Sequence, residues 1–209
     1  MRKKTPIPAR TIERMVLYKR LLSDMKSKGV RTLFSHELAE LANNTSTQVR
    51  RDLMEIGQSG SPRKGYDVVQ LIDNISRILE GSEERPVALV GVGNLGRAIL
   101  SYFSYSHPGL TIAAAFDRDA GKVGRIVAGC RCYHMNQLDD LVHEMKISLG
   151  IITVPAIAAQ EVADCMTGAG IRGILNFAPV PLKVPENVYV DRIDIASALE
   201  KVAYFTGLN

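Results

Sequence analysis

Residues 86–117 read PVALVGVGNLGRAILSYFSYSHPGLTIAAAFD, and this stretch decides the fold. The apolar run at 87–90 is typical of a strand that is buried on both faces of a parallel sheet. Three glycines in the pattern GxGxxG and then a helical pattern follow it. The first glycine permits a tight turn, the second lets a pyrophosphate approach the backbone, and the third lets the helix pack on the sheet. We therefore expect a dinucleotide to contact Gly91, Val92, Gly93, Asn94, Leu95 and Gly96.

The acid at the end of the next apolar run indicates which dinucleotide is bound. Residues 111–116 form that run, and Asp117 ends it. An acid at the end of the second strand accepts hydrogen bonds from the adenosine ribose and repels a 2′-phosphate, so Asp117 favours NAD(H) over NADP(H). The neighbouring Arg118 is the alternative, as a partner for a 2′-phosphate. A glycine-rich turn without a ligand is the other interpretation, which the strand, helix and acid together disfavour.

Strand and helix signals alternate after Asp117. Apolar runs at 126–133, 149–154, 174–177 and 188–193 predict strands, and residues 156–169 and a segment capped by Asn136 predict helices. This alternation predicts an α/β fold with a Rossmann-like, doubly wound parallel sheet. Ligands bind at the carboxyl ends of such strands. We therefore expect the cofactor beside Thr153, Val154, Pro155, Asn176, Phe177 and Ala178.

The N-terminal part of the chain is basic. Residues 1–66 carry a net charge of +8 and residues 67–209 a net charge of −4, which together give +4. A basic unit joined to a mildly acidic one suggests that nucleic acid binds at one end. A solvated basic face is the alternative.

The helical patterns of the basic part predict a helix-turn-helix. Residues 11–28 form a first helix with an apolar stripe, Ser35 caps a second, and Thr45 with Gln48 forms a capping box that opens a third. The core faces of the first and third helices are expected to comprise Ile12, Met15, Val16, Leu22 and Met25, and Val49, Leu53 and Ile56, respectively. In a helix-turn-helix the later helix enters the major groove by its N-terminal half. This places base edges and phosphates beside Ser46, Thr47, Gln48, Arg50 and Arg51. An ordinary surface helix is the alternative.

The segment GQSGSPRKGY at 57–66 predicts a wing of strand, turn and strand. Arg63 and Lys64 at its tip would contact phosphates or the minor groove. A flexible basic loop is the alternative. The helical pattern at 67–80 ends at Gly81, and we place the domain boundary there.

The last helix has an apolar side that a complete sheet does not need. Asp194 caps residues 195–206, with Ile195, Leu199, Val202 and Phe205 along one side. Docking on a second subunit and packing on its own domain both agree with this pattern.

Composition excludes some other classes. The chain is 46% hydrophobic but has no apolar run of bilayer length and no signal-type N-terminus, so we expect a cytoplasmic protein without membrane contact. Three cysteines do not make a disulfide framework. Cys130, Cys132 and His134 alternate as strand neighbours, but no fourth metal ligand is evident, and we expect no metal.

The ordered motifs resemble those of the Rex family of redox-sensing transcriptional repressors. The resemblance spans nearly the whole chain through TSTQVRRDL, GVGNLG, TVP, GILNFAPV and the acid after VYVDRI. The wing reads GQSGSPRKGY where the family pattern is GxxGxRGxGY, which leaves its phosphate contacts open. The implied domains are a winged-helix DNA-binding domain at 1–80, a Rossmann-like NAD(H) domain at 81–193 and an exchanged helix at 194–209.

The resemblance implies a homodimer that binds a palindromic double-stranded DNA operator, senses NADH against NAD+, and leaves DNA when NADH binds. It implies that the C-terminal helices are exchanged, so that Ile195 reaches the partner's nicotinamide. It assigns the contacts that change between states to Arg20, Tyr102 and Asp194. An NAD-dependent dehydrogenase is the alternative, but no histidine or lysine stands at the expected nicotinamide position. A DNA-binding protein that uses the fold only to dimerise is a second alternative.

Overall fold

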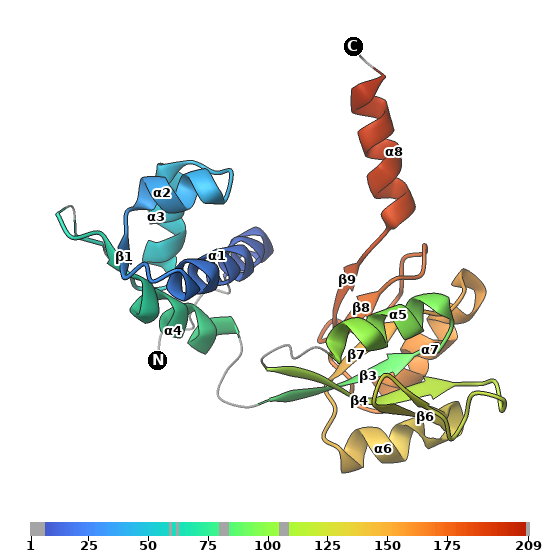
Figure 1. Ribbon diagram of the computed structural model, residues 1–209. Coiled ribbons are helices and arrows are strands. Elements are labelled where there is room, and N and C mark those ends of the chain that lie inside the picture. The colour runs from blue at the N-terminus through green and yellow to red at the C-terminus, as the bar shows by residue number, and fades with distance from the viewer. Residues whose placement is uncertain (1–6, 59, 62, 80–83, 105–108, 208–209) are drawn as a thin grey trace. The chain divides into compact units, whose positions relative to one another are not determined.

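The computed structural model describes residues 7–58, 60–61, 63–79, 84–104 and 109–207 (Figure 1). The chain divides into two compact units, Met1–Glu83 and Glu84–Asn209. Within the described ranges, no helix is long and apolar enough to cross a lipid bilayer.

The N-terminal unit is a small helical bundle with a two-stranded sheet. Its elements are α1 (Ala9–Ser27), β1 (Thr32–Leu33), α2 (Ser35–Leu41), α3 (Ser46–Glu55), β2 (Tyr66–Asp67) and α4 (Val68–Leu79). Its core contains Met15, Tyr18, Leu22, Leu38, Val49, Leu53, Leu71 and Ile75. The stripe predicted for α1 is partly wrong, because Val16 is 55% exposed whereas Thr11 and Tyr18 are buried. Their hydroxyl groups join a polar cluster that the apolar pattern does not reveal.

The helix-turn-helix is formed by α2 and α3. Thr45 caps α3 as predicted, since its hydroxyl oxygen accepts a hydrogen bond from Gln48 N at 3.1 Å. The predicted capping box is wrong in its other half, because the Thr45 N–H bonds Asn44 and the Gln48 side chain bonds Asp52. The predicted cap at Ser35 is wrong: Ser35 is the first residue of α2, Phe34 is the capping position, and the Glu37 carboxylate accepts the Phe34 N–H at 2.6 Å.

The wing extends from a small sheet formed by β1, which precedes α2, and β2, which follows α3. β1 and β2 pair antiparallel, and beyond them Ser61 and Gly65 exchange two backbone hydrogen bonds of 3.1 and 2.8 Å. Residues 59 and 62 of the predicted wing lie outside the described residues.

The C-terminal unit is built on one sheet. In the part that the structure describes, seven strands form it in the order β5-β6-β4-β3-β7-β8-β9, and every neighbouring pair except β5 and β6 is parallel. The strands are β3 (Arg85–Val90), β4 (Leu110–Asp117), β5 (Ile126–Val127), β6 (Cys130–His134), β7 (Leu149–Ile152), β8 (Gly173–Asn176) and β9 (Tyr189–Arg192). The predicted doubly wound, Rossmann-like sheet is confirmed.

Helices cover the two faces of the sheet differently (Figure 1). α5 (Asn94–Phe103) packs on one face, and α6 (Leu138–Glu144) and α7 (Ala156–Gly168) pack on the other. Alternate residues of β3 serve the two cores, because successive side chains of a strand point to opposite faces. The predicted cap at Asn136 is wrong: Asn136 lies within a 3-10 turn, Met135–Gln137, whose capping position is His134.

The last helix, α8 (Ile195–Thr206), has no buried side chain. Asp194 caps it as predicted, accepting the Ser197 N–H at 3.0 Å. Its large apolar residues Ile195, Leu199, Val202, Tyr204 and Phe205 are 57–66% exposed. A single copy of the chain therefore leaves an apolar helix face in water.

Candidate functional site

The three glycines of the first turn have different surroundings. Gly91 has φ +103°, and a Cβ there would lie 2.7 Å from the Thr153 carbonyl oxygen. A Cβ on Gly96 would collide with the Gly91 carbonyl oxygen. A Cβ on Gly93, the residue before α5, would meet nothing within 4 Å. The first and third glycines are thus required by the fold itself, and the second borders open space that a pyrophosphate fits.

A crevice of about 320 Å³ lies beside this turn, between the carboxyl ends of β3 and β7. The helix after β3 packs on one face of the sheet and the helix after β7 on the other, so this is the point where the strand order reverses. The crevice is lined by Val90, Gly91, Gly93, Asp117, Arg118, Lys122, Met135, Thr153, Val154, Pro155, Ala158 and Val162. It therefore unites the first turn, the acid after β4 and the loop after β7.

The Asp117 carboxylate is held by three donors. It accepts hydrogen bonds from Val92 N at 2.8 Å, Lys122 Nζ at 2.9 Å and Asp119 N at 2.9 Å. Burial opposes its ionisation, but these hydrogen bonds outweigh burial and lower the pKa of the carboxyl. A carboxylate has about four acceptor positions, so roughly one remains for a ribose hydroxyl. Lys122 was not predicted from the sequence, where its one signal is a positive charge five residues after Asp117.

Arg118 is engaged elsewhere. Its guanidinium forms a 2.5 Å ion pair with Glu161 of α7. A 2′-phosphate would have to compete with this carboxylate for Arg118.

The loop after β7 lines the crevice, whereas the predicted contacts at the end of β8, Asn176, Phe177 and Ala178, are not among its lining residues. The Thr153 hydroxyl lies 2.7 Å from the Gly91 carbonyl oxygen and ties the loop after β7 to the turn after β3. Asn176 is fully buried, and its amide binds the backbone of Ala178 and Val180 at 2.9–3.2 Å. The Asn176 amide is therefore engaged within the protein, and the predicted cofactor contact of Asn176 stays a prediction. Phe177 packs in the core on the α5 side, and Ala178 is buried in the opposite core.

The residues at the start of α5 differ in their exposure and in whether their backbone N–H groups are free to bind a phosphate. Val92 is buried, and its N–H is used by Asp117, so it is not free for a phosphate. Asn94 and Leu95 are exposed in the first turn of α5, where backbone N–H groups lack partners inside the helix.

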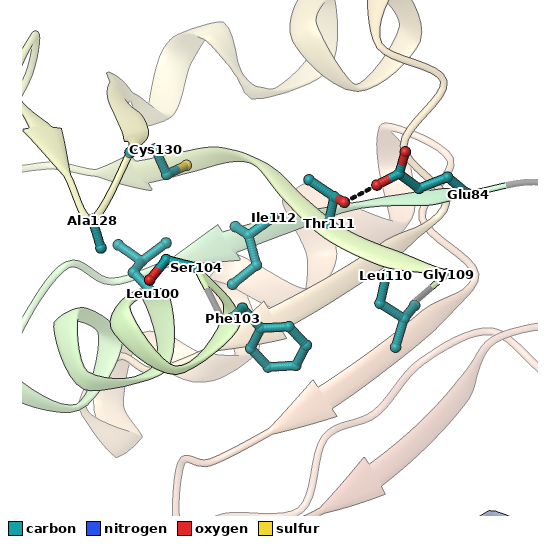
Figure 2. A pocket seen from close by; sticks show the side chains of 11 residues that line it. Glu84, Leu100, Phe103, Ser104, Gly109, Leu110, Thr111, Ile112, Ala128 and Cys130 are labelled. Carbon is teal, nitrogen blue, oxygen red and sulfur yellow. Dashed lines mark hydrogen bonds between the residues drawn. The ribbon is translucent and has the colours of Figure 1, made fainter. Parts of the chain in front are cut away.

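A second hollow, of about 560 Å³, lies near the start of β4, at the opposite end of that strand from Asp117. Figure 2 shows its apolar wall of Leu100, Phe103 and Ile112, and Glu84 hydrogen-bonded to the Thr111 hydroxyl. No predicted site residue lines it.

In the N-terminal unit, the residues of α3 that are predicted to contact DNA differ in solvent exposure. Thr47, Arg50 and Arg51 are exposed, whereas Ser46 and Gln48 are half-buried. Arg63 and Lys64 are exposed in the wing, and their backbone N–H groups bind the Ser61 hydroxyl at 3.3 Å.

Arg50 also borders a hollow of about 290 Å³ between the start of α2 and the wing. Its guanidinium lies 3.4 Å from the hydroxyl oxygens of Ser35 and Thr47. The other lining residues are Phe34, His36, Gly60, Ser61, Gly65 and Tyr66. The hydroxyl and imidazole groups of this wall were missed by the sequence analysis, because they come from segments far apart in the chain.

The three predicted switch residues lie in both units. Arg20 is exposed on α1, Tyr102 is 63% exposed on α5, and Asp194 is half-buried at the start of α8. Among the described residues, no group of three His, Cys, Asp or Glu side chains is arranged to hold a metal ion. Burial raises the pKa of Cys130 to about 11, which keeps this thiol protonated.

Comparison with known proteins identifies the family. Two family models match, one described as a CoA binding domain over residues 82–180 and one as a putative DNA-binding protein N-terminus over residues 6–53. The redox-sensing transcriptional repressor Rex of Pelotomaculum thermopropionicum is 39% identical over 95% of this chain and 93% of its own. The chain belongs to the Rex family. The Rex repressor of Streptomyces coelicolor is also 39% identical, over 95% of this chain and 77% of its own.

Solved Rex structures match the whole fold. RSP, a Rex-family repressor, in complex with NAD+ and operator DNA matches with a TM-score of 0.90 and 31% identity over 97% of this chain and 93% of RSP. RSP in complex with NADH matches with a TM-score of 0.85 and 30% identity over 98% and 100%. The predicted family and fold class are confirmed. The prediction of a regulator instead of an enzyme is confirmed as well, since these Rex relatives are named as repressors.

Proposed function

We propose that this Rex protein is a homodimeric repressor that binds a palindromic operator and leaves it when NADH binds. The observation that carries the proposal is the match over 97% of the chain to RSP bound to both NAD+ and operator DNA. Its site of action is the cytoplasm, where chromosomal DNA and the NAD(H) pool meet.

The crevice supports the choice of ligand. Gly93 leaves room at the turn, Asp117 is ionised where the ribose is expected, and Val154 and Pro155 give an apolar wall. The reduced nicotinamide ring is neutral and the oxidised ring is cationic. An apolar wall favours the neutral form, because burying an unpaired cation is costly.

The homodimer is supported by two apolar surfaces of the C-terminal unit. One is the exposed face of α8. The other is a groove of about 220 Å³ on the α5 side of the sheet, lined among others by Leu149, Leu175 and Tyr189. The described segment 177–188 between β8 and β9 contains no helix to cover this side. We infer that two copies exchange α8, which also brings Ile195 to the partner's crevice.

Exchange of α8 would couple the binding of NADH in the crevice to the binding of DNA by α3. Contacts among Arg20, Tyr102 and Asp194 that differ between two dimer states would let the crevice bias those states, since a ligand shifts an equilibrium only by its differential affinity. Half-sites lie about 34 Å apart, so a rotation of the subunits misplaces both α3 helices. DNA release then follows from geometry.

The test is a fluorescence anisotropy titration of the full-length protein on a palindromic duplex selected from a random pool. NADH is expected to weaken duplex binding at least tenfold, and NAD+ is expected to leave the complex intact. Salt is held constant, because phosphate contacts make the affinity salt-dependent. Equal effects of the two forms, in a protein shown to bind both, would refute the proposal.

Leu199→Glu is expected to convert the dimer to monomers. The substitution puts a charge on the apolar face of α8, where exchange would bury it twice per dimer, and we expect the dissociation constant to rise about 100-fold or more. Sedimentation velocity at several concentrations measures this. Lys201→Glu, off the apolar face of the same helix, is the matched control and should remain dimeric. If both variants stay dimeric, α8 is not the dimer contact.

Asp117→Asn is expected to relax discrimination against NADPH. The amide oxygen still accepts the Val92 N–H, but Lys122 loses its closer ion-pair partner, keeps only the 3.9 Å pair with Asp119, and attracts a 2′-phosphate. We expect the ratio of NADPH to NADH affinity to rise roughly tenfold. The double variant Asp117→Asn/Lys122→Met should lose most of this gain. Calorimetric titration with both cofactors gives the ratio, and an unchanged ratio in both variants would mean that the acid does not face the ribose.

A further inference from the structure

A buried ion pair joins α1 to the reading helix α3. Asp52 of α3 is fully buried, and both of its oxygens accept hydrogen bonds from the Arg14 guanidinium of α1, each at 2.6 Å. The Tyr18 hydroxyl of α1 donates to the same carboxylate at 3.0 Å. Burial opposes ionisation of Asp52, but the donors from Arg14, Gln48 and Tyr18 outweigh it and lower its pKa. The carboxylate is therefore charged.

The fourth donor to Asp52 is the side chain of Gln48, one turn earlier on α3. Gln48 Nε2 lies 2.8 Å from Asp52 Oδ1. An ionised carboxylate only accepts hydrogen bonds, so the NH₂ group of the amide must face Asp52 and its carbonyl oxygen cannot. The charge on Asp52 thus allows only one of the two orientations of the Gln48 amide.

This restraint acts on a residue at a reading position. Gln48 lies in the N-terminal half of α3 between the exposed residues Thr47 and Arg50, and it is only half-buried. A glutamine amide recognises adenine by pairing its oxygen and an N–H with N6 and N7 of the base. A side chain that is already oriented loses less conformational entropy on binding.

We propose that Arg14 and Asp52 are positioning residues that hold the Gln48 amide ready to read an adenine in the operator. The proposal rests on the proposed function, since it needs a DNA complex. An apolar pair of similar size would hold α1 against α3 about as well as a buried ion pair. Unlike an apolar pair, however, an ionised carboxylate binds the NH₂ group of the amide and excludes its carbonyl oxygen.

The experiment uses the full-length dimer without NADH and a palindromic duplex selected from a random pool by this protein. Each base pair of a half-site is changed in turn, symmetrically, and the affinity is measured by anisotropy for wild type, Gln48→Ala and Arg14→Met/Asp52→Leu. The control is Asp24→Asn/Lys28→Gln, which removes an exposed ion pair at the C-terminal end of α1 that does not contact Asp52. Thermal unfolding and NADH titration accompany every variant.

A good bidentate contact gives about 5- to 150-fold discrimination in one half-site. Because both half-sites are changed together, we expect Gln48→Ala to lose about 25- to 20,000-fold of discrimination at one A·T pair of the half-site. Arg14→Met/Asp52→Leu should lose most of its discrimination at that same pair, keep it at the others, and bind NADH and random duplex as wild type does. The control should keep the wild-type profile. If Arg14→Met/Asp52→Leu does not fold, Asp52→Asn replaces it, because an asparagine both donates and accepts and no longer sorts the amide.

Three outcomes would overturn the proposal: no position-specific loss in Gln48→Ala, full discrimination in a folded Arg14→Met/Asp52→Leu, or an equal loss at every position. Failure of the proposed function is distinct, since the wild-type protein would then select no duplex or would keep it in the presence of NADH.

Discussion

Gly96→Ala is expected to weaken NADH binding about 100-fold and to destabilise the C-terminal unit. The added methyl group would collide with the carbonyl oxygen of Gly91, which is backbone and cannot swing away. Gly91 is itself held by its N–H bond to Phe116 and by the Thr153 hydroxyl, so the turn has no easy route of relaxation. Overpacking of this kind costs about 1–3 kcal/mol or more, and we expect NADH affinity to fall about 100-fold. Calorimetric titration and thermal unfolding measure the two effects.

Gly93→Ala is the matched control, and it distinguishes an effect on NADH binding from an effect on the stability of the fold. Residue 93 has φ −82°, which alanine adopts without strain, and its methyl group would meet no protein atom within 4 Å. The variant should unfold at the wild-type temperature, bind the operator normally and fail to release it with NADH. Normal NADH affinity in Gly93→Ala would place the pyrophosphate away from this turn.

Arg50→Ala is expected to weaken operator binding about tenfold or more and to leave NADH affinity unchanged. Arg50 is exposed beside the Ser35 and Thr47 hydroxyls, at the hollow between α2 and the wing, where we expect a backbone phosphate to bind. A dimer loses two such contacts, so the slope of log affinity against log salt should become shallower by about 2. Anisotropy at four or more salt concentrations gives the slope.

Arg77→Ala removes the same charge from α4 of the same unit, outside the reading helix and wing, and serves as the control. Equal slopes for Arg77→Ala and Arg50→Ala would mean that only net charge matters and that Arg50 makes no phosphate contact.

Local signals in the sequence predicted the elements well. The glycines of the first turn, the Thr45 cap of α3 and the Asp194 cap of α8 act within a few residues, so their patterns survive in the folded chain. The parallel sheet followed from the alternation of strands and helices. The Ser35 cap was wrong because the extended residue Phe34 took the capping position, and the Asn136 cap was wrong because a 3-10 turn capped by His134 precedes α6.

Partners that meet across long stretches of sequence were not predictable. The position of Asp52 in the helical pattern does not say whether its side chain faces solvent or the core. Its partner Arg14 is 38 residues away in the sequence, so no local pattern reveals the ion pair. The burial of Asn176 depends on the path of the loop that follows β8, whose backbone carbonyl at Val180 accepts from the Asn176 amide, and no sequence pattern specifies that path. The predicted contacts of Arg20, Tyr102 and Asp194 require a second copy of the chain and stay predictions.

The exposed apolar face of α8 has a consequence for how the protein depends on its own concentration. If pairing is what covers this face, the amount of active repressor grows with the square of the chain concentration while the protein is scarce. A newly made chain must then meet another before proteases or chaperones reach its terminal helix. Below a certain number of copies per cell, too little dimer would form to occupy the operator, and a change in NADH would then have no effect on transcription.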